Sequence, residues 1–254
     1  MMKILAIILQ TIKEEWRRRT LLLLLLFPPI CVYSSTVFIS LTPGSEKKFM
    51  MDIGISSISF FMMFITALLS SDLFFKEERQ GTVYFFLSNP VRIEGVVLGK
   101  FFGGVLFLIL DLVLMGVFAL GVIFLKFHVW DMNFMKALLL LLGLFVILHA
   151  WGIFAATFLT KFTHFMMMVM IYFLGHLTNY SEYFGEYANG TFATIFQVLL
   201  KWVPNFERFE ARDLLVLDMN LEWAKIGHDY LYVILYSLPL IFLATFLLKR
   251  RNLS

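Results

Sequence analysis

Six long stretches almost free of charged side chains run through this 254-residue chain, and they decide what it can fold into. They hold 26, 19, 25, 24, 20 and 19 residues, at 20–45, 53–71, 101–125, 137–160, 162–181 and 230–248. Asp111 is the only charged residue within any of them. A helix needs about 20 apolar residues to cross the hydrocarbon core of a bilayer, so each stretch is a candidate crossing.

The composition agrees with a membrane protein. Hydrophobic residues make up 60% of the chain and charged residues only 15%, with a mean hydropathy of +0.84, whereas soluble proteins average about 25% charged residues. A soluble domain of this size could not hide so much apolar surface, but a bilayer removes the need to do so. We therefore predict an all-α polytopic fold with six transmembrane helices in a single domain.

The distribution of lysine and arginine predicts the orientation. With a cytoplasmic N-terminus, 13 of the 21 basic residues fall on the cytoplasmic side, which the positive-inside rule favours for both termini. The predicted layout is an interfacial helix at 1–19, crossings one and two at 20–73, a cytoplasmic segment at 74–100, crossings three to five at 101–181, an extracytoplasmic segment at 182–228, crossing six at 229–248 and a cytoplasmic tail at 249–254.

The N-terminal stretch is amphipathic. Its apolar residues recur at helical spacing on one face, which holds Leu5, Ile8, Leu9, Ile12 and Trp16. This pattern is typical of a helix that lies in the membrane interface. Such a helix could serve only to anchor the first crossing or could also touch a partner protein, and periodicity leaves both readings open.

The most polar stretch of the first half, "KEERQGTVYFFLSNPVRIEGVVLGK", occupies residues 76–100. "KEERQ" continues the helix of the second crossing until Gly81 breaks it. An aromatic helix or turn follows and ends at Asn89-Pro90, because the residue before proline disfavours helix. A short aromatic helix on the cytoplasmic side suits a groove of another protein; the alternative is a loop whose phenylalanines dip into the headgroups.

The chain carries no nucleotide-binding motif of its own. "GVVLGK" lacks the four residues that a Walker loop places between its first glycine and its Gly-Lys pair, and Phe101 replaces the hydroxyl residue that should follow. We expect Gly95 and Gly99 to allow close helix packing and Lys100 to extend to the interface. Any energy from ATP would have to come from a second polypeptide, so we do not expect an enzyme.

The stretch "EERQGTVYFFLSNPVRIEGVVLGKFFG", from Glu77 to Gly103, resembles the signature of permease subunits of type-2 ATP-binding-cassette exporters. In that signature an acidic residue, "GT", an apolar core, a Pro-Val pair with a basic residue and "GK-x-x-G" follow the second crossing. Asn89 and Ile93 depart from it, at positions where basic residues are common. "IKEEWRRRTLLLL" and "WVPNFERFEARDLL" are similar to the subgroup of nitrous-oxide-reductase-maturation and gliding-associated permeases.

The resemblance implies half of a transporter in the cytoplasmic membrane. Two copies would pair, and each would rest a cytoplasmic coupling helix on one of two ATPase subunits, which would hold the ATP and Mg²⁺; this chain would need no cofactor and no nucleic acid. The coupling residues implied are Glu77, Glu78, Gly81, Thr82, Phe85, Phe86, Ser88 and Pro90. ATP-driven closure of the ATPases would then rock the crossings between inward-open and outward-open states.

Ionisable residues inside crossings are functional candidates, because a charge at bilayer depth is costly unless it is paired, hydrated or protonated. Asp111 lies in the third crossing, and His149, midway along the fourth, is its most obvious partner. The alternatives are an interhelical hydrogen bond of purely structural value and an intramembrane enzyme that uses both residues. No Cys or His cluster has the spacing of a zinc or haem site, and we expect no metal site.

The last water-facing segment, 182–228, could be an amphipathic lid, cover the pathway of a dimer or receive an extracytoplasmic protein. Its residues 191–203 have the length of a short interfacial or re-entrant helix. A different kind of function is also open: a membrane anchor or assembly factor that holds an extracytoplasmic maturation complex and transports nothing. No side-chain set selects a substrate.

Overall fold

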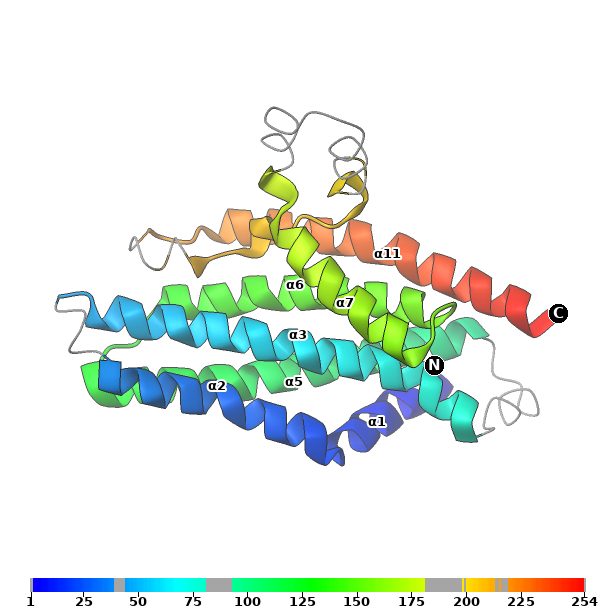
Figure 1. Ribbon diagram of the computed structural model, residues 1–254, viewed down its shortest axis with the longest axis horizontal. Coiled ribbons are helices and arrows are strands. Elements are labelled where there is room, and N and C mark those ends of the chain that lie inside the picture. The colour runs from blue at the N-terminus through cyan, green and yellow to red at the C-terminus, as the bar shows by residue number, and fades with distance from the viewer. Residues whose placement is uncertain are drawn as a thin grey trace.

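Figure 1 shows the computed structural model as a bundle of long helices, with both termini near the same end. The structure describes residues 2–38, 44–80, 93–180, 198, 200–212, 215 and 219–253. Every named element within these ranges is helical, as the sequence predicts. They are α1 (Met2–Trp16), α2 (Arg19–Phe38), α3 (Glu46–Gln80), α5 (Ile93–Phe127), α6 (Met132–Ala156), α7 (Lys161–His176), α11 (Trp223–Leu253) and the 3₁₀ turns η2 (Thr178–Tyr180) and η3 (Glu207–Phe209).

Four of these helices are long and apolar enough to cross a membrane. They correspond to the second, third, fourth and sixth predicted crossings and comprise residues 46–71 of α3, all of α5 and α6, and residues 223–250 of α11. The two longest, α3 and α5, have 35 residues each. At 1.5 Å per residue each is about 50 Å long, well beyond the ~30 Å of hydrocarbon.

The first and fifth predicted crossings correspond to shorter elements. The apolar part of α2 described by the structure is Leu23–Phe38. α7 has only 16 residues, or about 24 Å, and it crosses the bundle obliquely in Figure 1. The fifth stretch is uncharged as far as residue 181, but its helix stops at His176, because Leu177 caps it and a 3₁₀ turn follows.

The helices α3, α5 and α6 pack against one another at the centre of the bundle. Around them, α2 lies against α3 and α5, α1 against α5, α7 against α3 and α6, and α11 against α6 and α5. The core between them is filled by fully buried side chains such as Met62, Met63, Phe107, Phe134 and Phe145. Large apolar side chains also cover the outer faces, as expected for helices in lipid.

Two polar contacts attach the short helix α7 to the bundle. Nε2 of His164 lies 3.0 Å from the carbonyl oxygen of Gly152 in α6. The hydroxyl of Tyr172 lies 2.7 Å from that of Ser59 in α3. In an apolar environment such hydrogen bonds between helices replace part of the driving force that water supplies to soluble bundles.

Candidate functional site

The residues predicted to couple the chain to an ATPase begin at the end of α3. This helix runs without a break to Gln80, which confirms that "KEERQ" continues the second crossing and places Glu77 and Glu78 in its last turn. The remaining predicted residues lie outside the part of the chain that the structure describes: Gly81, Thr82, Phe85, Phe86, Ser88 and Pro90. α5 begins at Ile93, so the 12 residues 81–92 join two long neighbouring helices directly.

The first turns of α5 contact several other helices. Glu94 forms an ion pair with Lys249 near the end of α11. Val97 and Phe101 belong to a separate apolar cluster between α5, α6 and α11, whose other buried members are Ala150, Ile153, Leu240, Ile241 and Ala244. Lys100, also in these turns, is only 3% exposed, so its side chain is covered by the surrounding helices.

Two adjacent glycines of α5 bring two more helices close. A Cβ atom built on Gly103 would lie 2.8 Å from Cβ of Thr11 in α1. A Cβ atom built on Gly104 would lie 2.2 Å from Nε2 of His149 in α6. Successive residues of a helix point about 100° apart, so this pair accepts α1 on one side and α6 on another. Only glycine permits both approaches.

His149 fills the space over Gly104 completely. Its ring is 0% exposed and stacks on Phe101, with the ring centroids 5.8 Å apart and the planes at 18°. Neither ring nitrogen has a hydrogen-bond partner in the described part of the chain. The ring therefore packs between α5 and α6 beside the backbone of Lys100 and Phe101.

Asp111 is buried as well, but the structure does not bring it together with His149. It is 2% exposed, and its Oδ2 atom has no hydrogen-bond partner among the described residues. His149 lies opposite Gly104 and Leu138 lies opposite Gly116, which sets the antiparallel register of α5 and α6. Asp111 is seven residues beyond Gly104, or about 10 Å along the helix axis. The two predicted polar residues thus occupy different levels of the bundle.

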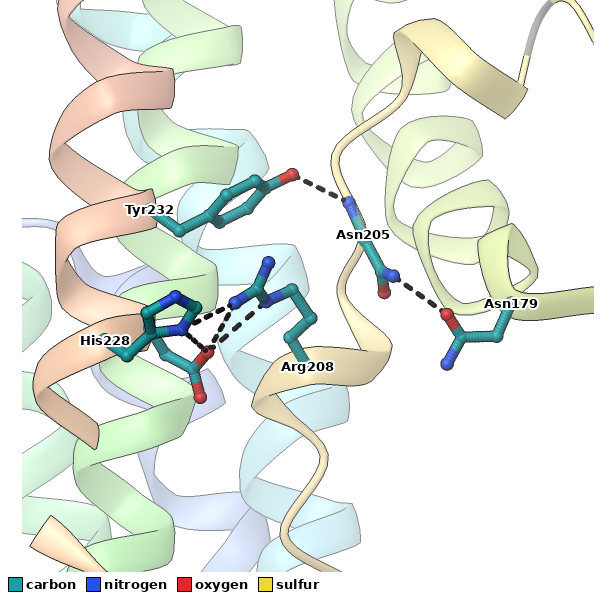
Figure 2. Close-up of polar contacts among 6 residues, drawn as sticks. Asn179, Asn205, Arg208, His228 and Tyr232 are labelled. Atoms are coloured by element: carbon teal, nitrogen blue, oxygen red, sulfur yellow. Dashed lines mark hydrogen bonds and ion pairs between the residues drawn. The ribbon is translucent and has the colours of Figure 1, made fainter. Parts of the chain in front are cut away.

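A polar network at the other end of the molecule was not foreseen from the sequence. It fixes the return segment, whose described residues are 203–212, 215 and 219–222, to the helices around it (Figure 2). Nε and Nη2 of Arg208 donate to Oδ1 of Asp229 in α11, at 3.3 and 3.1 Å. The backbone N–H of Asn205 donates to the hydroxyl of Tyr232, and its side-chain amide donates to Asn179, at 3.1 and 2.8 Å.

The return segment is also joined to α3, α6 and α7. Nζ of Lys136, a buried residue of α6, donates to the carbonyl oxygen of Leu221 at 2.6 Å. Arg212 forms an ion pair with Asp52 of α3, and the N–H of Phe206 donates to Gly175 of α7 at 3.0 Å. The alternating charges of "NFERFEARDLL" hinted at such pairs, but the partners are distant in the sequence and could not be assigned.

The described residues offer no group of three or more His, Cys, Asp and Glu side chains that could hold a metal ion. Met62, Met63 and Met168 are buried in the apolar core, whereas Met166 and Met170 of α7 are exposed. Methionine is a flexible apolar filler, and its distribution here fits that role.

Comparison with known proteins adds the family. The model of the ABC-2 type transporter family matches residues 2–186, which include α1, the four helices from α2 to α6, the 81–92 segment and α7. A search of the curated proteins gives no match. Because the family match covers well over half of the 254 residues, and because the bundle has the long apolar helices that a membrane component requires, the chain belongs to the ABC-2 type transporter family.

Proposed function

We propose that this chain is the membrane-spanning subunit of an ATP-driven exporter, in which two copies pair and two cytoplasmic ATPase subunits supply the energy. Membership of the family makes it a membrane permease component of such a transporter and implies a partner ATPase. The outward direction and the pairing of two copies rest on the resemblance of Glu77–Gly103, and the kinship with the nitrous-oxide-reductase-maturation and gliding-associated subgroup rests on "IKEEWRRRTLLLL" and "WVPNFERFEARDLL".

The observation that carries the coupling role is the position of residues 81–92. They lead directly into α5, whose first turns contact α11 through Glu94, α1 through Gly103 and α6 through Gly104. A displacement of this segment would therefore reach three other helices within about three turns.

The proposed topology keeps six crossings, with α2 and α7 as the first and fifth and with both termini in the cytoplasm. Exposed tryptophans support the placement of the bilayer: Trp16 ends α1 on the proposed inner side, whereas on the proposed outer side Trp130 follows the end of α5 by three residues and Trp223 begins α11. Tryptophan is enriched at both membrane interfaces. Residues 182–228 would then face the outer side, where an extracytoplasmic partner could bind.

Replacing Phe85 and Phe86 together by aspartate is expected to abolish association with the ATPase, because two charges cannot enter an apolar groove. The measurement is co-purification from membranes followed by ATP turnover of the complex. Phe158→Asp is the matched control, since Phe158 is an exposed phenylalanine outside this segment, and the ATPase should stay bound. If neither the wild-type protein nor the Phe158→Asp variant co-purifies with an ATPase, the membrane-anchor alternative replaces the transporter.

The orientation can be tested with single cysteines, because Cys31 is the only one in the chain. In a Cys31→Ser background, Ser88→Cys should resist a membrane-impermeant thiol reagent in intact cells and react only after permeabilisation. Val129→Cys, exposed between α5 and α6 at the other end, should react in intact cells. The reverse pattern would place the aromatic segment outside and contradict the coupling role.

A further inference from the structure

We infer that Gly103 is a positioning residue that makes α1 and α5 a single rigid unit, so that α1 moves together with the helix that leaves the 81–92 segment. The inference rests on the proposed function and extends it to the N-terminal helix. It is drawn from the way α1 contacts the rest of the protein.

α1 lies between the lipid-facing surface and α5. Leu5, Leu9 and Trp16 are 61%, 59% and 43% exposed, whereas Thr11 and Glu15 are 6% and 2% exposed. The exposed apolar side chains are free to enter the lipid interface. The isoleucines at 7, 8 and 12 are half-buried, and the contact between α1 and α5 is among the most extensive between two helices in the described part of the chain.

The two helices approach each other closely at Gly103. A Cβ atom there would lie 2.8 Å from Cβ, 3.0 Å from Cγ2 and 3.2 Å from Oγ1 of Thr11. The nearest of these atoms is attached directly to the backbone of α1, and no change of rotamer can move it away. An alanine at position 103 would therefore have to push the whole of α1 outwards. Close backbone approach at small residues is a usual way to join helices in lipid.

The C-terminal end of α1 is followed closely by α2. Glu15 pairs with Arg18, with Oε2 and Nε 3.1 Å apart, within the short link between the two helices. α1 is therefore joined to α5 at Thr11 and leads through this link directly into α2. If α5 is moved through residues 81–92, α1 would move with it along the membrane surface, and α5 would not slide past α1.

The first test needs no ATPase. In a Cys31→Ser background, spin labels at Leu9 in α1 and Leu106 in α5, both exposed, should give one narrow distance distribution in reconstituted protein. Gly103→Ala should shift and broaden this distribution at least about twofold. Adding Thr11→Gly should restore it, whereas adding Thr11→Ala should not, because alanine keeps the clashing Cβ atom. Gly121→Ala, in α5 with nothing within 4 Å, should leave it unchanged.

The second test uses the complex with its ATPase. The distance between Leu9 and Leu106 should be the same in the nucleotide-free and ATP-bound states, and Gly103→Ala should weaken the influence of the permease on ATP turnover while the ATPase remains bound. A nucleotide-dependent change in the wild-type distance, or an unaltered distribution in Gly103→Ala, would overturn the inference while the transporter role stands. If wild-type protein binds no ATPase, the proposed function itself fails.

Discussion

Gly104→Val is expected to lower the free energy of unfolding by about 2–3 kcal/mol, in the range found for overpacked cores. Even the first added atom would lie 2.2 Å from Nε2 of His149 and 2.5 Å from Cε1. The ring cannot retreat, because it is 0% exposed and stacked on Phe101. The effect should appear as a fall of at least about 5 °C in the thermal midpoint of the purified protein in detergent micelles.

Two further variants make this prediction specific. Gly121→Val introduces the same side chain into the same helix where a Cβ would meet nothing within 4 Å, and its effect should be below about 1 kcal/mol. His149→Ala should recover much of the stability lost in Gly104→Val, because it removes the ring that the new side chain strikes. Equal losses at positions 104 and 121 would show that backbone propensity, not the contact between α5 and α6, is responsible.

Arg208→Met is expected to destabilise the return segment by about 2–4 kcal/mol. The substitution leaves the Asp229 carboxylate, whose side chain is only 4% exposed, without the guanidinium of Arg208; the imidazole of His228, 3.9 Å away, is 70% exposed. Removing one partner of a buried ion pair costs far more than the pair itself contributes, because a buried charge is left uncompensated. The loss can be measured as a lower thermal midpoint and as faster proteolytic cleavage within residues 203–222.

A double variant separates the two contributions. Arg208→Met with Asp229→Leu should be more stable than Arg208→Met alone, since it removes the stranded charge together with its partner. Arg212→Met serves as the matched control: its ion pair with Asp52 has a half-exposed guanidinium, and exposed pairs contribute roughly 0–1 kcal/mol. Comparable losses of stability in Arg208→Met and Arg212→Met would contradict the idea that the buried Asp229 carboxylate causes the larger destabilisation.

The helical fold could be read from the sequence because its cause is local. Long uncharged runs predict α3, α5, α6 and α11, and the continuity of the helix up to Gln80 followed from the absence of a breaker before Gly81. The length of α7 could not be read in this way. Counting uncharged residues up to 181 included Thr178 and Asn179, which are polar but uncharged and form a 3₁₀ turn instead.

The contacts between helices were harder to predict from the sequence, because they depend on the register in which the helices pack. Asp111 and His149 are both near the middle of their uncharged runs, which suggested a common depth. In the structure α5 begins at Ile93, eight residues before the run of 101–125, so positions along the two runs do not correspond to equal depths. In the same way, the glycines at 103 and 104 could be recognised as small residues, but which helices they admit depends on neighbours distant in the sequence.

The length of α3 and α5 has a geometrical consequence. Each is about 50 Å long, so together they project some 20 Å more than the hydrocarbon requires. In the proposed topology this excess extends α3 and α5 towards the cytoplasmic side, so an ATPase bound there, as we propose, would act on the ends of two helices that project beyond the bilayer. A tilt of a few degrees within the bilayer then produces a larger displacement at the projecting ends of α3 and α5. A slight rotation of the crossings is therefore enough to follow a modest closing of the two ATPase subunits.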